Sequence, residues 1–310
     1  MQSGVLVLDK PEGPSSAQVV ERVKKILGAR KVGHLGTLDP FASGLLPMGV
    51  EEGTKIAGIL LAAHKSYAGV ITLGIETETQ DKTGKVVNAR SVAPVNKARL
   101  ESLRAAFTGN LHQVPPMYSA LKRSGVRLYE LARRGESVPR EAREITVERL
   151  ELWQVSEAEI GFKVVCSKGT YIRTLAADMG EFLGCGAHLK SLRRLSCGSL
   201  TLDQAVSLVE LEHLKSKEEV PLIPLSDALN HLPKMTVNSE SSARLRMGQQ
   251  EILGSLAPAR QGETLARIAD EQGVLVALVQ WVDEESRMGW RLARVFGSES
   301  RAQDGVAGYS

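Results

Sequence analysis

Segments typical of strands and of helices follow one another in this chain without the regular βαβ alternation that builds a parallel sheet. The run GVLVLDKP at 4–11 is typical of a strand that ends in a turn, and KSYAGVITLG at 65–74 alternates as a strand does. Between them, Ser15 and Gln18 match a capping box at the start of a helix, and Gly28 is placed to end it. This order predicts a mixed α+β domain.

Similar patterns continue to the end of the chain, whose 310 residues suffice for one large domain and one small one. A composition break between Pro221 and Pro233 predicts the boundary, and residues 298–310 hold too few apolar side chains to pack, so we expect them to be disordered. The other expected elements are a helix from Asn96 to near Gly109, strands at 143–155 and 160–166, a helix from Tyr171 to Gly184, an apolar helix at about 203–214, and β-type runs at 274–282 and 288–296 in a small C-terminal module.

Composition and cysteine usage argue against several classes of protein. With 43% hydrophobic and 24% charged residues, the chain is typical of soluble globular proteins, and its longest apolar run, at 56–63, is too short to cross a bilayer. The N-terminal residues lack the pattern of a secretory signal. The three cysteines form no CxxC pair and the histidines are scattered, which argues against a disulfide framework or a metal site. We therefore expect a cytoplasmic protein, and the Gly-rich stretch at 33–49 matches no nucleotide-binding pattern.

Positive charge is concentrated in one segment. The net charge of the chain is only +3, but residues 122–143, KRSGVRLYELARRGESVPREAR, carry seven Lys or Arg against three Glu. Such clustering is expected of a surface that binds a polyanion, although a solvated helix face has the same composition. Pro115, Pro116 and Pro139 bracket the segment, so we expect it to leave the main domain as an excursion.

The stretch GHLGTLDPFASGLLP at 33–47 presents one carboxylate, Asp39, among glycine, proline, threonine and serine. Glycines allow unusual backbone angles and prolines fix φ, so the pattern predicts a rigid, irregular loop built around this acid. The alternative is that Asp39 only caps a turn, as an aspartate before a proline often does.

A second polar motif lies at 167–195, SKGTYIRTLAADMGEFLGCGAHLKSLRRL. It places Tyr171 and Arg173 in the first turn of an apolar helix, where an arginine is unfavourable to the helix dipole. A carboxylate partner would explain the arginine, and Asp39 is a candidate. Such an ion pair favours the charged form of a carboxyl group.

These two motifs, together with YSALKRSGVRLYELARRG and VPREAR, resemble the bacterial tRNA pseudouridine-55 synthases of the TruB family. The similarity covers most of residues 4–200, with the motifs in the same order. It implies the pseudouridine synthase fold, in which helices flank a mixed, largely antiparallel sheet, with a small C-terminal β-rich PUA-like domain that binds RNA. The implied boundaries are 1–229 for the catalytic domain, with a basic RNA-binding insertion at 118–143, and 230–297 for the PUA-like domain.

The resemblance also assigns roles to single residues. It implies that Asp39 is the catalytic aspartate, that Arg173 keeps it charged and oriented, and that Tyr67 stacks on the base and serves in proton transfer. Leu192 would wall the pocket, and His34 would brace the stack that the flipped base leaves, although a structural loop histidine remains an alternative. The further residues expected to bind substrate are Tyr171, Lys122, Arg127, Arg133 and Arg134.

The implied reaction breaks the glycosidic bond of uridine and rejoins the same uracil through C5. It needs no redox step and no metal, so we expect no cofactor. The sequence does not decide whether Asp39 attacks the sugar C1′, attacks C6 of the base, or removes a sugar proton. The expected partner is the T arm of tRNA, from which the base must be flipped, and we expect a monomer that requires no protein partner.

Two other functions are compatible with the same residues. One is a non-catalytic RNA-binding or RNA-remodelling protein, which a decayed catalytic loop would favour, yet Asp39, Tyr67 and Arg173 are all present. The other is a guide-RNA-dependent synthase of the related archaeal and eukaryotic type. The long basic insertion favours a stand-alone tRNA enzyme.

Overall fold

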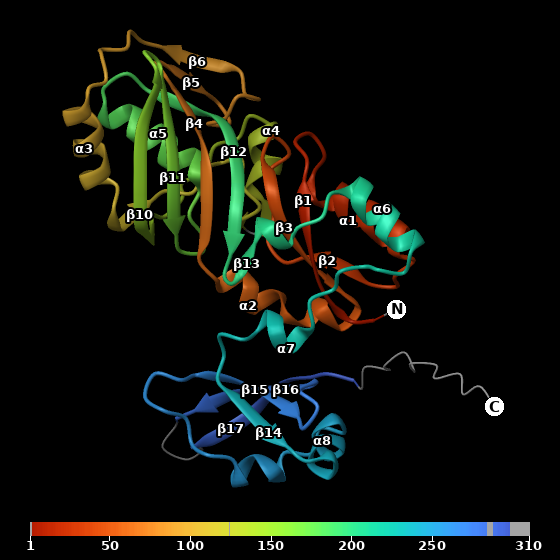
Figure 1. Ribbon diagram of the computed structural model, residues 1–310. Coiled ribbons are helices and arrows are strands. Elements are labelled where there is room, and N and C mark those ends of the chain that lie inside the picture. Colours follow the sequence, from red (N-terminus) through yellow and green to blue (C-terminus); the bar gives the residue numbers. More distant parts are fainter. Residues whose placement is uncertain (1, 124, 284–287, 298–310) are drawn as a thin grey trace.

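A long mixed sheet organises the larger part of the chain (Figure 1). The computed structural model describes residues 2–123, 125–283 and 288–297, so the tail at 298–310 that we expected to be disordered lies outside the described residues. In these residues nine strands form the main sheet: β1 (Gly4–Lys10), β2 (Val32–His34), β3 (Ser43–Val50), β4 (Lys65–Leu73), β7 (Gly109–Gln113), β10 (Arg143–Ser156), β11 (Glu159–Cys166), β12 (Ala187–Cys197) and β13 (Leu200–Thr201).

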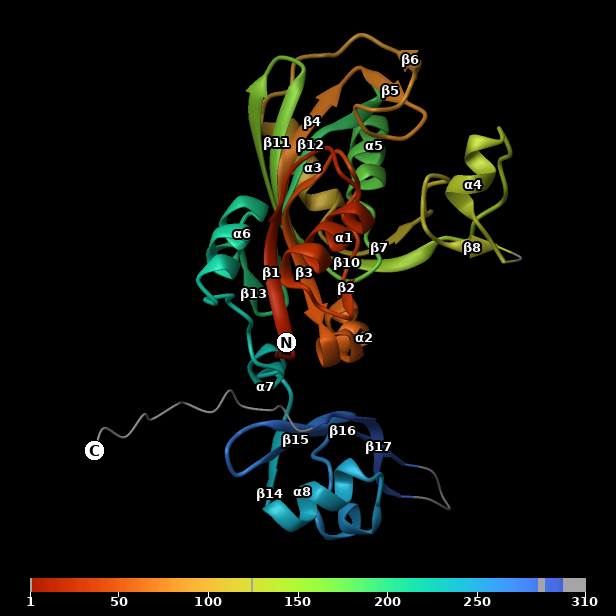
Figure 2. The same cartoon turned by 90° about the vertical axis from the view of Figure 1, so that its right-hand side faces the viewer.

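Helices and two small hairpins complete this part. The helices are α1 (Ser16–Leu27), α2 (Ala57–Ala62), α3 (Lys97–Ala106), α4 (Leu128–Arg133), α5 (Ile172–Phe182), α6 (Leu208–Ser216) and α7 (Leu225–Ala228). The hairpins pair β5 (Ile75–Thr77) with β6 (Val86–Ala89), and β8 (Lys122–Arg123) with β9 (Val126–Arg127). In Figure 2 the segment with β8 and α4 projects away from the sheet, as expected of the basic insertion.

The main sheet runs in the order β1-β3-β12-β4-β11-β10-β7 and is largely antiparallel, as predicted. Its one parallel junction along this path joins β3 to β12 through the pairs Arg193 with Ser43 and Arg194 with Gly44. β12 meanwhile pairs along its length with β4, so that Arg194 lies opposite Tyr67. The short β3–β12 pairing therefore joins the two halves of the sheet, and it lies at the start of β3, directly after the loop at 35–42.

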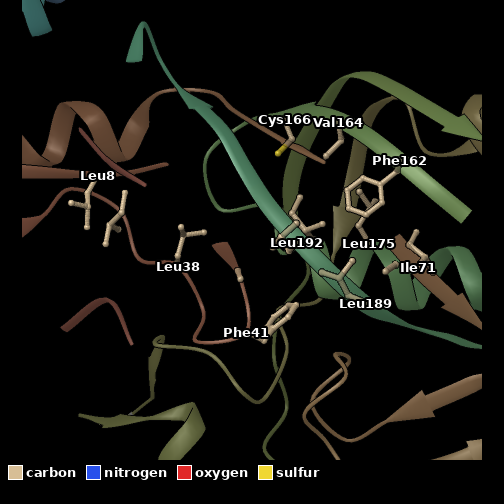
Figure 3. Packing of buried hydrophobic residues seen from close by; sticks show 14 of the residues in the cluster. Leu8, Leu38, Phe41, Ile71, Phe162, Val164, Cys166, Leu175, Leu189 and Leu192 are labelled. Atoms are coloured by element: carbon tan, nitrogen blue, oxygen red, sulfur yellow. The ribbon is translucent and has the colours of Figure 1, made fainter. Parts of the chain in front are cut away.

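The core fills the space between the sheet and its helices. Ser15 accepts a hydrogen bond from the backbone N–H of Gln18 in the predicted capping box, and Gly28 ends α1 with φ at 62°. Buried side chains of α1, α5 and the sheet form one cluster, of which Figure 3 shows a part around Leu189 and Leu192 of β12. Because the sheet and helices that carry the polar motifs share this core, the site rests on a rigid support.

A second, four-stranded sheet lies in the C-terminal part, in the order β14-β15-β16-β17. The strands are β14 (Lys234–Val237), β15 (Leu265–Asp270), β16 (Leu275–Val282) and β17 (Gly289–Val295), and the helix α8 (Ser239–Arg246) follows β14. It has its own cluster around Trp290, while Leu275, Leu278 and Phe296 pack with Leu225 and Leu229 below the main sheet.

Several element predictions were wrong in position. The irregular loop expected at 33–47 is limited to residues 35–42, because β2 ends at His34 and β3 begins at Ser43. Leu45 and Leu46 belong to β3 and are fully buried, which a strand covered on both faces permits. By contrast, the helix expected from Asn96 is present as α3: the Asn96 side chain accepts a hydrogen bond from the Arg99 N–H, and the helix ends at Ala106, before β7.

The largest omission was β12, which the sequence did not predict. Its letters AHLKSLRRLSC lack clean alternation because two register shifts interrupt the pairing with β4 and because Arg194 is buried. The apolar helix expected at about 203–214 is α6, which begins at Leu208. The hairpin β5–β6 and the elements β14, α8 and β15 were also missed.

Candidate active site

The loop at 35–42 presents Asp39 at the meeting point of two cavities. One cavity, of about 310 Å³, is lined by Asp39, Tyr67, Tyr171, Leu192 and others. The second, of about 450 Å³, opens on the other side of Asp39 toward the basic insertion. A larger cleft of about 620 Å³ lies between α2 and β17, but none of the predicted site residues lines it.

The backbone of this loop is held by buried polar side chains that the sequence did not reveal. Lys10, which is fully buried, donates from Nζ to the carbonyl oxygens of Pro40 (3.3 Å) and Ala42 (2.7 Å). Ser16 Oγ donates to the Leu38 carbonyl at 2.8 Å and accepts from the Leu38 N–H at 2.9 Å. Burial lowers the pKa of Lys10 to about 8. The loop is therefore fixed on several sides before any substrate binds.

Asp39 and Arg173 form the ion pair that the sequence suggested. Arg173 Nε lies 2.9 Å from Asp39 Oδ2, and the arginine side chain is 6% exposed whereas the carboxylate is 39% exposed. The rest of the guanidinium donates to the carbonyl oxygens of Thr79 and Tyr118, both at 2.8 Å. The buried arginine thus has a single orientation, and Asp39 keeps a face open to the cavities.

A second carboxylate, Asp81, lies behind Arg173 and was not predicted as part of the site. Its Oδ2 is 3.7 Å from Arg173 Nε, and its side chain is 6% exposed. Asp81 Oδ1 accepts hydrogen bonds from Thr79 Oγ1 (2.8 Å) and from the N–H of Thr83 (2.9 Å). In the sequence this acid is indistinguishable from an ordinary turn residue, since only its distance to Arg173 sets it apart.

Tyr67 and Leu192 line the smaller cavity together. Tyr67 lies on β4 and Leu192, 7% exposed, on the neighbouring strand β12. Burial raises the pKa of Tyr67 to about 12, so its hydroxyl is neutral at physiological pH and can donate a hydrogen bond. The cavity accordingly offers one aromatic ring and one aliphatic wall close to Asp39.

Tyr171 and His34 line different cavities. Tyr171 precedes α5 and lines the smaller cavity, where Gln113 fixes its backbone by bonds to both its N–H (2.8 Å) and its carbonyl oxygen (3.1 Å). His34 ends β2 and lines the larger cavity, and its Nδ1 is buried without a hydrogen-bond partner. Burial, followed by the charge of Arg194, lowers the pKa of His34, so the ring is neutral at physiological pH.

The basic insertion contributes two of its arginines to the larger cavity. Arg127 and Arg133 line it and lie on the ring of Tyr129, with guanidinium carbons 5.9 and 5.5 Å from the ring centroid. Lys122 and Arg134 are exposed but line neither cavity beside Asp39. The structure thus brings Arg127 and Arg133 to the site and leaves the other two on the outer surface of the insertion.

Two further properties concern the residues that the structure describes. Within the described ranges, His, Cys, Asp and Glu side chains form no group of three or more that could hold a metal ion. In the same part of the chain, every helix is too short or too polar to cross a membrane.

Two sequence comparisons identify the same family. Residues 24–172 match the family model of the N-terminal domain of TruB family pseudouridylate synthases, and residues 173–232 match the tRNA pseudouridylate synthase B C-terminal domain. The chain is 43% identical to the tRNA pseudouridine synthase B of Geobacter sulfurreducens, over 94% of this chain and 99% of that protein. It is 46% identical to the protein of the same name from Burkholderia lata, over 88% and 85% of the two chains.

Solved structures share the fold. A Cbf5-Nop10-Gar1 complex contains a chain with 28% identity and a TM-score of 0.73, covering 95% of this chain and 85% of that one. An H/ACA RNP bound to a substrate RNA containing 2′-deoxyuridine contains a chain with 25% identity and a TM-score of 0.71, covering 96% and 86%. The mixed, largely antiparallel sheet is therefore the pseudouridine synthase fold, and this chain belongs to the TruB family of pseudouridylate synthases.

Proposed function

We propose that this protein isomerises uridine 55 in the T arm of tRNA to pseudouridine, as a stand-alone enzyme. The observation that carries the proposal is the Asp39–Arg173 ion pair, at 2.9 Å, on the wall shared by two cavities. Relatives that are 43–46% identical over most of the chain bear the name tRNA pseudouridine synthase B, which supports tRNA as the substrate.

Asp39 is the catalytic residue of the proposed reaction. The bond between C1′ and N1 of the uridine breaks, the uracil turns, and a bond between C1′ and C5 forms. The C5 proton leaves and N1 gains a proton, so the reaction is an isomerisation without net change in atoms or electrons. An ionised Asp39 initiates it by attack on C1′ or C6, or by removal of a sugar proton, while Arg173 orients the carboxylate.

The smaller cavity is the proposed site for the flipped base. Leu192 and the ring of Tyr67 would enclose the uracil and keep the detached base beside the sugar, and the neutral Tyr67 hydroxyl could serve in proton transfer. Tyr171, fixed by Gln113, would close the same cavity from the side of α5. His34 lines the second cavity, where its ring would brace the stack that the base has left.

The basic insertion at 118–143 would hold the RNA by its phosphates. Arg127 and Arg133, which line the larger cavity, would contact the strand beside the flipped nucleotide, while Lys122 and Arg134 would contact phosphates farther out. Contacts of this kind read the shape of the T arm rather than the edges of its bases.

The boundaries and setting of the protein are part of the proposal. Residues 1–229 would form the catalytic domain and residues 230–297 a PUA-like domain that adds RNA contacts. We infer a cytoplasmic monomer that needs neither a cofactor nor a protein partner. The three buried, unpaired cysteines are compatible with the reducing compartment in which tRNA is modified.

Incubation of the pure protein with unmodified tRNA, without guide RNA, tests the proposed function. Nuclease digestion and mass spectrometry after cyanoethylation of pseudouridine should show modification at position 55 only. RNA binding without product would support a non-catalytic RNA-binding protein. Product that forms only when guide RNA is added would support a guide-dependent synthase.

A further inference from the structure

Arg194 is a buried cation beside the candidate site that the proposed chemistry does not use. It lies on β12, its side chain is 1% exposed, and the described residues offer its guanidinium no carboxylate as a salt-bridge partner. The adjacent Arg193 points to the other side of the strand, is 42% exposed and pairs with Asp9 at 2.7 Å. A buried arginine without a counter-ion is costly, so its hydrogen bonds must supply the compensation.

Its guanidinium donates to backbone carbonyl oxygens on both sides of Asp39, in the loop and in β3. On the entering side, Nη2 donates to the carbonyl oxygen of Gly36 at 3.0 Å, and Nη1 donates to that of Thr37 at 3.2 Å. On the leaving side, Nε donates to the carbonyl oxygen of Leu45 at 2.6 Å. One planar guanidinium thus fixes the distance between the chain before Asp39 and the chain after it.

The backbone of Arg194 is tied to the same region. It pairs with Gly44 of β3 on one side and with Tyr67 of β4 on the other. Gly44 has φ at 99°, and a Cβ there would lie 2.3 Å from the Arg194 carbonyl oxygen, so the approach admits no side chain. Arg194 therefore connects the Asp39 loop to the strand that carries Tyr67.

We propose that Arg194 is a positioning residue for the isomerisation, which sets Asp39 relative to Arg173 and Tyr67 by tying Gly36 and Thr37, before Asp39, to Leu45 of β3, after it. The inference rests on the proposed function. Lys10 and Ser16 hold the loop at Leu38, Pro40 and Ala42, so the loop stays folded when Arg194 is changed, but Gly36 and Thr37, which lead to Asp39, are free to shift. A shift of about 1 Å at a catalytic group costs on the order of 10²-fold in rate.

The test compares Arg194→Lys and Arg194→Met with the wild type and with Arg193→Lys, a control on the exposed side of the same strand. Lysine keeps the charge but loses the planar fork, and methionine loses both. We expect Arg194→Lys to melt cooperatively, to bind T-arm RNA within about threefold of the wild-type Kd, and to lose on the order of 10²-fold in the single-turnover rate at saturating RNA. Arg194→Met should lose at least as much, and Arg193→Lys should match the wild type.

Measuring the single-turnover rate and the RNA affinity separately distinguishes a positioning role from a structural or RNA-binding role of Arg194. A purely structural role would lower the melting temperature and leave the single-turnover rate of the folded Arg194→Lys protein unchanged, which would overturn the inference. So would a loss confined to RNA affinity. If Arg194→Met does not fold, Arg194→Lys decides alone. An inactive wild type would instead contradict the proposed function, so the two failures are distinguishable.

Discussion

Asp39 illustrates how much of a single residue's chemistry depends on side chains far away in the sequence. Its carboxylate is fixed by Arg173, and Arg173 is fixed by the backbone of Thr79 and Tyr118 and by the neighbouring Asp81. Because Arg173 is buried and its hydrogen bonds are directional, it holds the Asp39 carboxylate in one orientation toward the cavity. Asp39, the proposed catalytic residue, is the accessible part of an otherwise enclosed polar cluster.

Tyr67 gives this site a signature at alkaline pH. Its pKa is about 12 in the folded state because of burial, against 10.0 for an ordinary tyrosine. Between these two values the folded protein holds a proton that the unfolded chain has released, so the free energy of unfolding falls as the pH rises through this window. The melting temperature of Tyr67→Phe should therefore fall less than that of the wild type as the pH is raised from 9 to 11.

Calorimetry or circular dichroism at a series of pH values measures this difference. Tyr129→Phe is the control for loss of a tyrosine hydroxyl away from the main core, because Tyr129 lies on α4 of the basic insertion, and its melting temperatures should follow those of the wild type. An identical alkaline loss of melting temperature in Tyr67→Phe and wild type would contradict the raised pKa of Tyr67.

At the scale of elements, the basic insertion should bind RNA without taking part in the chemical step. Replacing Arg127, Arg133 and Arg134 together by alanine should weaken tRNA binding and flatten its dependence on salt by roughly one in log K against log salt for each phosphate that the variant no longer binds. Because two of these arginines line the larger cavity, a change in slope of about one to two is expected. The single-turnover rate at saturating tRNA should change little.

Alanine at Arg22 and Arg104 provides the control, since both are exposed arginines on helices outside the insertion. Affinity and salt slope that stay at the wild-type values in the triple variant would mean that the segment is only a solvated face.

The elements also show what the sequence could and could not predict. Residue patterns predicted α1 from its capping box, α5 from its helical apolar period, and β1, β4, β10 and β11 from runs typical of strands. β12 has no such pattern, since buried, partly buried and exposed side chains follow one another irregularly along it and it encloses the charged Arg194. Of the site, the Asp39–Arg173 pair followed from an arginine unfavourably placed in a helix turn. Asp81, Lys10 and Arg194 did not, because only tertiary contacts distinguish them from surface residues.

At the scale of the whole molecule, one apolar cluster joins the two parts of the chain. Leu278 of β16 is 2% exposed and packs in the same cluster as Leu225 and Leu229, which precede the second sheet. Leu278→Ala should therefore lower the free energy of unfolding by about 2–5 kcal/mol, as buried leucine truncations do. Chemical denaturation measures the change, and Val209→Ala, at a 72% exposed position, should leave stability within about 0.5 kcal/mol of the wild type.

The proposed reaction makes a prediction for the complete protein. An isomerisation led by an aspartate needs neither electron transfer nor a metal-bound group, so activity should persist in EDTA at a monovalent salt concentration that keeps the tRNA folded. Initial rates with and without chelator measure this. A loss of activity that one specific metal restores, by acting on the protein rather than on the fold of the tRNA, would contradict it.

The central claim is that the charge of Asp39 initiates pseudouridine formation, and Asp39→Asn tests it most directly. The amide keeps the shape of the side chain and removes the charge. With tRNA carrying tritium at C5 of uridine, release of tritium under single-turnover conditions reports the reaction, and filter binding reports the affinity of the same variant. The account predicts nearly unchanged affinity and a rate at least about 10²-fold below wild type. A variant that binds tRNA and retains more than about a hundredth of the wild-type rate would contradict it.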